Sequence, residues 1–167
     1  ELGFKSIGKN VLISRNARFY SPKTIEIGNN VRIDDFCIIS GDVKIGSHIH
    51  ISAYVAIYGK LGVELEDYTG ISPRSTIYSA MDDFSGDYLI GPIHDESKTN
   101  VTGGKVLVKR FAQIGCNSVI FPNITIGEGC VVGACSLVRS SLDDWYIYTG
   151  IPVSKLRKRS SSLQNKV

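Results

Sequence analysis

One stretch of the chain, residues 80–104, carries the side chains best suited to proton transfer. It holds His94, whose imidazole has an ordinary pKa of about 6.5 and can therefore exchange a proton near neutral pH. Acidic residues surround this histidine, and Asp82, Asp83 and Glu96 are candidates to orient it or to bind a substrate. The simpler alternative is a solvated acidic loop. The stretch predicts a site where a histidine base removes a proton from an attacking nucleophile.

The other histidines and the four cysteines show no pattern of metal ligands. His48 stands at a turn position and His50 at an outward one, and we expect both to be ordinary surface residues. The cysteines include no C-x-x-C pair and no histidine at zinc spacing, which favours reduced thiols and no metal. Cys37 and Cys130 occupy small, inward-facing positions of the repeat described next. The other two cysteines lack a neighbouring base, so neither is a strong candidate nucleophile.

An aliphatic residue recurs every six positions through most of the chain, as in "IGNNVR IDDFCI", "IGSHIH ISAYVA" and "IGCNSV IFPNIT IGEGCV VGACSL". The fifth position is small or β-branched, and the third and fourth are rich in turn-forming residues. Each unit therefore indicates a short strand followed by a turn. Six residues match neither a helical period nor a hairpin. Three units predict one triangular coil of about 18 residues, and stacked coils predict a parallel β-helix.

The positions of the extra residues indicate how the coils are arranged. The period slips by two residues after Ile25, Val43 and Val63, once per coil, which predicts a single corner that carries the additions. Residues 80–104 break the period altogether. Because each coil of a solenoid contacts only its neighbours, we expect this insertion to leave the β-helix at a corner as a functional loop.

The tandem units resemble those of the hexapeptide-repeat acyltransferases over residues 7 to about 158. This resemblance implies an all-β, left-handed parallel β-helix with one extruded loop, at about 80–104, and a short C-terminal extension. The hand comes from the family, since crossovers between parallel strands are ordinarily right-handed. The family also implies a homotrimer with sites between subunits. We expect one β-helix domain, residues 1–158, and a basic polar tail, residues 159–167, that is flexible.

The loop carries a more specific resemblance. The segment "PIHDE", residues 92–96, resembles the "HPVHHE" stretch of galactoside- and maltose-type O-acetyltransferases, in which the second histidine is the catalytic base. The match implies that His94 is the base and that Glu96 takes the place of the glutamate. Gly91 and Asp95 stand where the motif has its other histidines. The preceding "IYSAMDDFSG" is similar to acetyltransferases of bacterial surface-polysaccharide gene clusters.

The C-terminal part resembles the acyl-donor end of acetyl-CoA-dependent members. The segments "IGCNSV" and "YTGIPVSKLRKR" are similar to the "IGAGSVV…GNPAKVIKER" ending of those enzymes. The match implies that coenzyme A lies in a groove between two β-helices, with amides and small residues along pantetheine and basic groups at the phosphates. A backbone N–H near residues 112–115 is the expected oxyanion donor. The implied cofactor residues are Ala112, Gly115, Gly133, Ala134, Arg139, Lys155 and Arg157.

Length and charge limit the remaining function classes. The 167 residues suit one domain, and no apolar run approaches the roughly 18 residues of a membrane span. The net charge of +3 includes five basic residues after Trp145, where the chain has no acidic residue, so the remaining body is about −2. Such a body is a poor nucleic-acid surface, and a basic end suits a small phosphorylated ligand. We expect a complete, cytoplasmic protein.

The sequence thus predicts an acetyl-CoA-dependent acetyltransferase that acts on a sugar or nucleotide-sugar hydroxyl or amine, for bacterial surface polysaccharide. In this hypothesis His94 deprotonates the acceptor as it attacks the thioester directly, without an acyl-enzyme. Two alternatives come from other classes. A γ-carbonic-anhydrase-like metalloenzyme would need three suitably spaced histidines, and the spacing here is wrong. A non-catalytic β-helix subunit of a larger assembly is the other.

Overall fold

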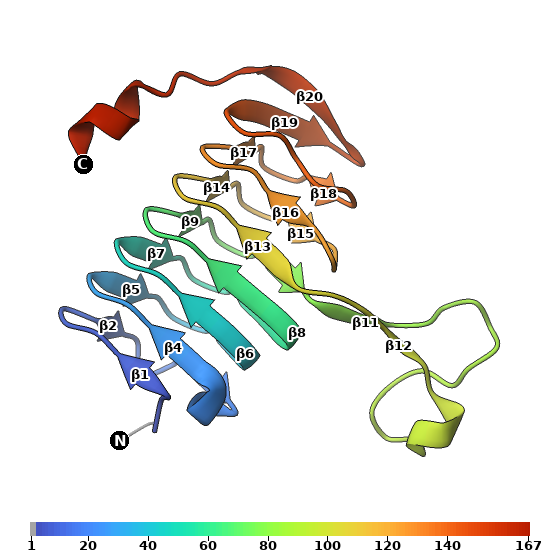
Figure 1. Cartoon of the computed structure of the whole chain (residues 1–167). Helices are drawn as coiled ribbons and strands as arrows, with labels where there is room; N and C mark the ends of the chain where they lie inside the picture. The colour runs from blue at the N-terminus through green and yellow to red at the C-terminus, as the bar shows by residue number, and fades with distance from the viewer. Residues whose placement is uncertain (1–2) are drawn as a thin grey trace.

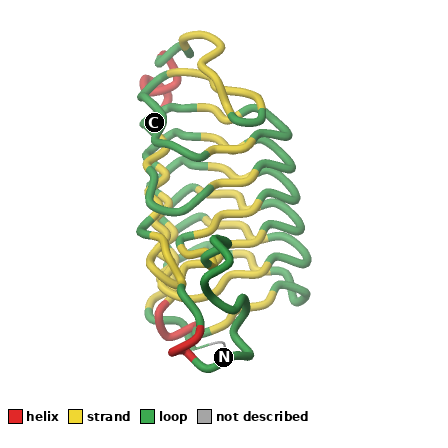
Figure 2. The backbone as a smooth tube through the Cα atoms, turned by 90° about the vertical axis from the view of Figure 1, so that its right-hand side faces the viewer, coloured by secondary structure: helices red, strands yellow, loops and turns green. Residues whose placement is uncertain are grey.

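The structure is a computed structural model that describes residues 3–167, and these residues form a column of stacked triangular coils (Figure 1). Two long strands, β6 (Ile38–Ile45) and β8 (Ala56–Leu65), each turn a corner and so belong to two faces of the prism. The other strands are short because a turn follows every few residues. Seen from the side, the strands lie in register from coil to coil (Figure 2). The predicted parallel β-helix is confirmed.

Three faces make up the prism, and we name them A, B and C. Face A combines the second halves of β6 and β8 with β1 (Ser6–Ile7), β4 (Ile25–Ile27), β13 (Val106–Val108) and β16 (Thr125–Ile126). Face B holds β2 (Leu12–Ile13), β5 (Val31–Ile33), β7 (Ile49–Ile51), β9 (Gly70–Ile71), β14 (Gln113–Ile114), β17 (Val131–Val132) and β19 (Tyr146–Gly150). Face C combines the first halves of β6 and β8 with β3 (Arg18–Tyr20), β10 (Thr76–Tyr78), β15 (Val119–Ile120) and β18 (Leu137–Val138).

The core is a set of aliphatic columns, one for each face. On face C, successive coils place Ile39, Ile57, Ile77, Ile120 and Val138 inside the prism, and each is completely buried. Burial of one such side chain stabilises the fold by about 1.5–3 kcal/mol. The first position of the six-residue unit is therefore aliphatic because it fills the prism, as the sequence predicts.

The corner between faces A and B uses a left-handed backbone conformation at the fourth position of the unit. His48, Tyr68 and Phe111 have φ of 60°, 61° and 64°. Their side chains stack along the corner, with ring centroids 4.7 Å apart between His48 and Tyr68 and 5.3 Å apart between Tyr68 and Phe111. His48 therefore has a structural place in this stack, and its side chain is exposed, which agrees with the surface position expected for it.

The C-terminal segment closes the last coil. β20 (Val153–Lys158) turns back and pairs antiparallel with β19. Arg159, which we placed at the start of a flexible tail, is instead fixed to the prism: its Nη1 donates 2.9 Å hydrogen bonds to the carbonyl oxygens of Phe111 and Gly129. A short 3₁₀ helix, η3 (Ser162–Lys166), follows, and Gln164 donates to Glu128. The ordered domain therefore extends past residue 158.

No helix within residues 3–167 is long and apolar enough to cross a membrane.

Candidate active-site cleft

The insertion leaves the prism as an arm between faces C and A. Its stem is a two-stranded antiparallel ladder of β11 (Ala80–Asp82) and β12 (Val101–Gly103), and the arm extends away from the column (Figure 1). Gly103 has φ of +155° and packs against the backbone of Ser79, so a side chain there would collide with the carbonyl oxygen of Ser79. The prediction that residues 80–104 are extruded at a corner is confirmed.

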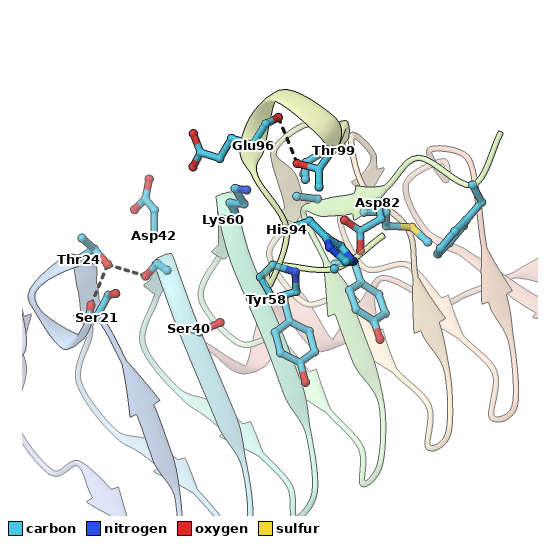
Figure 3. A pocket seen from close by; sticks show the side chains of 18 residues that line it. Ser21, Thr24, Ser40, Asp42, Tyr58, Lys60, Asp82, His94, Glu96 and Thr99 are labelled. Carbon is cyan, nitrogen blue, oxygen red and sulfur yellow. Dashed lines mark hydrogen bonds between the residues drawn. The ribbon is translucent and has the colours of Figure 1, made fainter. Parts of the chain in front are cut away.

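A cleft of about 960 Å³ lies between this arm and the outer surface of face C. Strands β6, β8 and β10 supply its floor, and the arm supplies one wall. Figure 3 shows the side chains that face it, from the turn around Thr24 on one side to His94 and Asp82 toward the other. The lining residues are Ser21, Thr24, Ser40, Gly41, Asp42, Tyr58, Lys60, Tyr78, Ala80, Met81, Asp82, Phe84, Gly91, Pro92, His94, Glu96, Thr99 and Val101.

Three of the four loop residues singled out from the sequence line this cleft. Asp82 comes from the last position of the stem strand and is half-buried, whereas His94 and Glu96 come from the distal part of the arm and are exposed. The imidazole of His94 and the carboxylate of Asp82 project into the same part of the cleft (Figure 3). A base and an acidic group are thus available to one bound substrate.

Asp83 has a different place. Asp83 follows the last residue of β11 and is not among the residues that line the cleft. Its carboxylate accepts a 2.8 Å hydrogen bond from the backbone N–H of Ser85 and a 2.8 Å bond from the amide of Asn100. These hydrogen bonds lower the pKa of Asp83. Asp83 therefore braces the base of the arm and does not line the cleft.

Asp95 also has a structural task. Its side chain accepts a 3.0 Å hydrogen bond from the backbone N–H of Ser97 and so caps the 3₁₀ helix η2 (Glu96–Lys98). The backbone and hydroxyl bonds from Ser97 lower the pKa of Asp95. An N-cap with an acceptor side chain suits aspartate. This accounts for an aspartate at the position where the O-acetyltransferase motif has histidine.

The electrostatics of the cleft favour a cationic ligand group. Its lining includes the carboxylates of Asp42, Asp82 and Glu96 and a single permanent cation, Lys60. Within the part of the chain that the structure describes, Lys60 belongs to none of the ion pairs. An ammonium group of a substrate would gain from the surplus of negative charge, because opposite charges attract strongly where water is displaced.

Sequence reasoning missed the floor of the cleft. Tyr58 and Tyr78 stack there with ring centroids 5.3 Å apart and an angle of 16° between their planes. Ser40, Asp42 and Lys60 also line it. The sequence did contain a signal, because the two-residue slips of the six-residue period occur at this corner. Identifying the floor residues from that signal requires the register between coils, which places residues about 20 positions apart side by side.

Three of the small residues predicted to hold coenzyme A, namely Gly115, Gly133 and Ala134, lie at the corner between faces B and C. A side chain on Gly115 would collide with backbone atoms of Gly133 and Ala134 in the next coil, and one on Gly133 would press on Thr149. Ala112 is completely buried, so its methyl group faces the prism interior. Close stacking between coils therefore accounts for Gly115 and Gly133, while Ala134 is exposed.

At three of the four residues from 112 to 115, the backbone N–H predicted to stabilise the oxyanion is already engaged in another hydrogen bond. The backbone N–H of Ala112 donates to Lys109, that of Gln113 to Cys130 and that of Gly115 to Val132, at 2.7–3.1 Å. These amides are part of the turns and ladders that hold the coils together. The expectation of a free N–H is therefore wrong for Ala112, Gln113 and Gly115.

The basic residues predicted at the donor end lie in the last coils. Lys155 of β20 is engaged: its Nζ is 2.7 Å from Asp143 Oδ2 and 3.9 Å from the centroid of the Tyr146 ring. The hydrogen bond to Asp143 raises the pKa of Lys155, so its charge is partly compensated. Arg139 is exposed and lies over the ring of Phe121 at 5.8 Å, and Arg157 is exposed on β20. Both arginines are accessible to an anionic group.

The buried thiols are inert. Burial raises the pKa of Cys37, and it raises the pKa of Cys130 to about 12. A thiol that stays protonated is a poor nucleophile. No group of three or more His, Cys, Asp or Glu side chains within residues 3–167 is arranged to hold a metal ion.

Comparisons with known proteins place the chain among transferases. A family model for "Bacterial transferase hexapeptide (six repeats)" matches residues 24–59. A dTDP-4-amino-4,6-dideoxy-D-glucose acyltransferase from Escherichia coli is 42% identical over 98% of this chain and 86% of its own length.

Solved structures agree. AntD, an N-acyltransferase from Bacillus cereus, is 54% identical in its complex with dTDP and 3-hydroxybutyryl-CoA, with a TM-score of 0.96 over 99% of this chain and 88% of that one. A hexapeptide-repeat acetyltransferase from Vibrio cholerae shares the fold, with a TM-score of 0.63 at 19% identity over 95% of this chain and 76% of that one. The identity extends over nearly the whole length of the chain, and the protein therefore belongs to the hexapeptide-repeat acyltransferases, with their left-handed β-helix.

Proposed function

We propose that this protein transfers an acyl group from an acyl-CoA to the amine of a nucleotide-linked amino sugar, with a dTDP-linked 4-amino sugar as the first candidate. The names of two relatives support this acceptor, because one acts on a dTDP-4-amino-4,6-dideoxyglucose and a variant of AntD was crystallised with that sugar and coenzyme A. The acidic cleft supports an amine over a hydroxyl. The acyl group stays open between acetyl, expected from the sequence, and larger groups such as the 3-hydroxybutyryl group carried by the CoA bound to AntD.

The observation that carries the proposal is the presence of Asp82 and His94 in one cleft (Figure 3). Asp82 binds the ammonium form of the sugar amine and positions it. The ammonium first loses one proton to water; the free amine nitrogen then attacks the thioester carbonyl, and His94 takes the second N–H proton as the C–N bond forms. The C–S bond then breaks, and the leaving coenzyme A thiolate takes the proton from protonated His94. Amide and free thiol are the products, and no acyl-enzyme is needed.

A spacing in AntD supports the role of Asp82. Crystal structures of that relative include variants at one serine and at an aspartate ten residues later. This chain repeats the spacing at Ser72 and Asp82, and again at Ser85 and Asp95. The second aspartate is occupied as a helix cap. Ser72 does not line the cleft with Asp82 and follows β9, at the corner between faces B and C. A shared role for this pair would therefore need Ser72 from another subunit.

We further propose a homotrimer with its active sites between subunits. One prism face is too shallow to enclose coenzyme A, so the groove needs a second subunit. The arm also exposes large apolar side chains: Phe84 is 67% exposed and Ile93 87%. Exposed apolar groups of this kind favour an interface. The acyl-CoA would then lie along the C-terminal coils, with Arg139, Lys155 and Arg157 near its phosphates. Acyl-CoA and a nucleotide sugar are both cytoplasmic metabolites, which supports a cytoplasmic role in surface-polysaccharide synthesis.

The test measures the release of the coenzyme A thiol in the presence of an acyl-CoA and dTDP-4-amino-4,6-dideoxyglucose as the acceptor. A panel of acyl-CoAs identifies the donor, and the 4-hydroxy sugar nucleotide of the same series separates N- from O-transfer. The proposal predicts turnover with the amino sugar and none above background with the hydroxy sugar. Equal turnover with both would refute selection by the acidic cleft, and absence of turnover with every acyl-CoA would refute the proposed reaction.

A further inference from the structure

A row of outward-facing residues crosses face C, one from each coil. The register pairs Tyr20 of β3 with Ser40 of β6, Ser40 with Tyr58 of β8, and Tyr58 with Tyr78 of β10. The residues just before them in these strands point into the prism, so the four side chains must point outward. Phe121 continues the row, because it follows Ile120, the partner of Ile77.

From Tyr20 to Phe121 the row is aromatic at every coil except one, and in the last coil Arg139 follows Val138, the partner of Ile120. Tyr58 and Tyr78 fill neighbouring places and stack at 5.3 Å. Ser40 is the small residue between Tyr20 and Tyr58. Neighbouring strands lie about 4.8 Å apart, so the backbones that carry Tyr20 and Tyr58 are about 9.6 Å apart. A planar ring stacked between two other rings needs about 3.5 Å to each of them. The gap above Ser40, between the rings of Tyr20 and Tyr58, is therefore wide enough for one planar ring. Tyr20 is 60% exposed, which leaves its ring free to form one wall.

This slot opens into the cleft. Ser40 and Tyr58 line the cleft together with Ser21, Thr24 and Asp42. Figure 3 shows Ser21, Thr24 and Asp42 on the side away from His94, with Tyr58 between them and His94. Thr24 is held in place there, since its hydroxyl lies 2.6 Å from the carbonyl oxygen of Gly41 and 2.8 Å from that of Ser21. The slot thus combines aromatic walls with fixed polar groups at its rim.

Lys60 lies close to both the slot and the proposed reaction site, since it follows Tyr58 by two residues on β8 and lines the same cleft as His94. Figure 3 draws its ammonium group between Asp42 on one side and His94 on the other. It is the single permanent cation among the lining residues of the described chain. The cleft therefore contains a ring-shaped slot, one cation and the acidic site at Asp82. A nucleoside diphosphate sugar carries a matching set of groups: a planar base, two phosphates and a sugar amine.

We propose that the base of the nucleotide-linked acceptor stacks over Ser40 between Tyr20 and Tyr58, with its diphosphate toward Lys60. This rests on the proposed function and assigns residues to its acceptor. Ser40 acts by its small size, because a larger side chain would fill the slot. Stacking of a base on an aromatic side chain is worth about 1–3 kcal/mol by alanine substitution.

The experiment measures dTDP binding to the full-length protein by calorimetry. Tyr58→Ala removes one wall and should weaken binding about 5- to 150-fold. Ser40→Tyr completes the aromatic row on an outward surface and should abolish binding, while thermal stability and acyl-CoA binding stay unchanged. Tyr54→Ala is the matched control: Tyr54 also stacks on an aromatic ring, that of Phe36, but lies at another corner and outside the cleft. It should bind dTDP like the wild type.

The outcomes separate this inference from the proposed function. Wild-type turnover and dTDP binding combined with unchanged binding in Ser40→Tyr and Tyr58→Ala would overturn the slot and leave the reaction standing. A second outcome is that the wild type binds dTDP but shows no turnover with any acyl-CoA, while Ser40→Tyr abolishes dTDP binding. That result would overturn the reaction and leave the slot standing. If Ser40→Tyr instead changes the oligomer mass and keeps dTDP binding, the slot accepts a side chain of a second copy, and the inference is wrong. If Ser40→Tyr fails to fold, Tyr58→Ala against Tyr54→Ala decides.

Discussion

Asn100 donates a 2.8 Å hydrogen bond to the carboxylate of Asp83 across the base of the arm. The bond joins the strand that leaves the prism to the segment that returns to it. It therefore fixes the direction in which the arm, and with it His94, projects over face C.

Asp83→Ala should loosen the arm without unfolding the β-helix. The expected result is a higher KM for the amino sugar with a smaller change in kcat, because substrate binding depends on the arm position and the hydrogen bonds to the Asp83 carboxylate, from Ser85 and Asn100, lie within the arm. Asp87→Ala is the control, since Asp87 is an exposed aspartate of the same arm. Unchanged KM in Asp83→Ala, with arm protection from hydrogen exchange also unchanged, would contradict the brace.

Removal of a buried hydroxyl group should have opposite effects on stability at Thr69 and at Ser118. Thr69 is 3% exposed, and its Oγ1 has no hydrogen-bond partner within residues 3–167. Ser118 Oγ donates a 3.0 Å bond to the carbonyl of Gly133. Thr69→Val should raise the free energy of unfolding by about 1 kcal/mol, because an unpaired buried hydroxyl is replaced by a methyl of the same shape. Ser118→Ala should lower it by about 1–3 kcal/mol. Denaturant unfolding of both variants measures the pair, and equal signs would contradict the hydrogen-bond assignment.

Gly129 makes room for the single tryptophan. Its φ is +61°, and a side chain there would occupy the space of the Trp145 ring. Gly129→Ala should cost about 2 kcal/mol or more of stability, since both the backbone conformation and the ring oppose a methyl group. Trp145 is the one tryptophan, so the protein's tryptophan fluorescence reports on this ring alone. Displacement of the ring toward water should shift its emission to longer wavelength. A variant with wild-type emission and stability would contradict this packing.

The pH dependence of stability has a contribution from Asp34. Burial raises the pKa of this carboxyl, but hydrogen bonds from Arg32 and His50, at 2.7 Å each, outweigh burial and lower it. A pKa lower in the folded than in the unfolded state adds stability above the unfolded value of about 3.9. That stability is lost as the pH falls through the folded pKa. The gap in unfolding free energy between wild type and Asp34→Asn should therefore be present at pH 7 and shrink below about pH 4. A constant gap from pH 7 to pH 2 would contradict the ion-paired carboxyl.

The six-residue period predicted the fold because it reports directly on burial. Residues such as Ile57 and Ile77 are aliphatic since they fill the prism, and the break at residue 80 showed where the arm leaves it. The sequence could not separate Asp82 from Asp83, because that choice depends on where the ladder of β11 and β12 ends and on the bond from Asn100. It also could not reveal the aromatic row, whose members are far apart in the sequence and meet only through the register of the coils.

The ending of the chain shows a second limit. Its basic residues suggested a solvated tail, since charge alone does not reveal partners. In the structure, the guanidinium of Arg159 finds carbonyl oxygens at the corner stack, at positions 30 and 48 residues away. Such contacts depend on the three-dimensional course of β20 and have no local sequence signal.

Acyl transfer from acyl-CoA to dTDP-4-amino-4,6-dideoxyglucose, measured for the wild type, His94→Ala and Asp82→Asn across pH, tests the cleft most directly as the active site. His94→Ala should lower kcat/KM by about 10²- to 10⁴-fold and remove the acidic limb of the pH profile, as expected for loss of a general base. Asp82→Asn should mainly raise KM for the amino sugar. Wild-type turnover in both variants, with acceptor and acyl-CoA still bound, would show that the reaction takes place elsewhere.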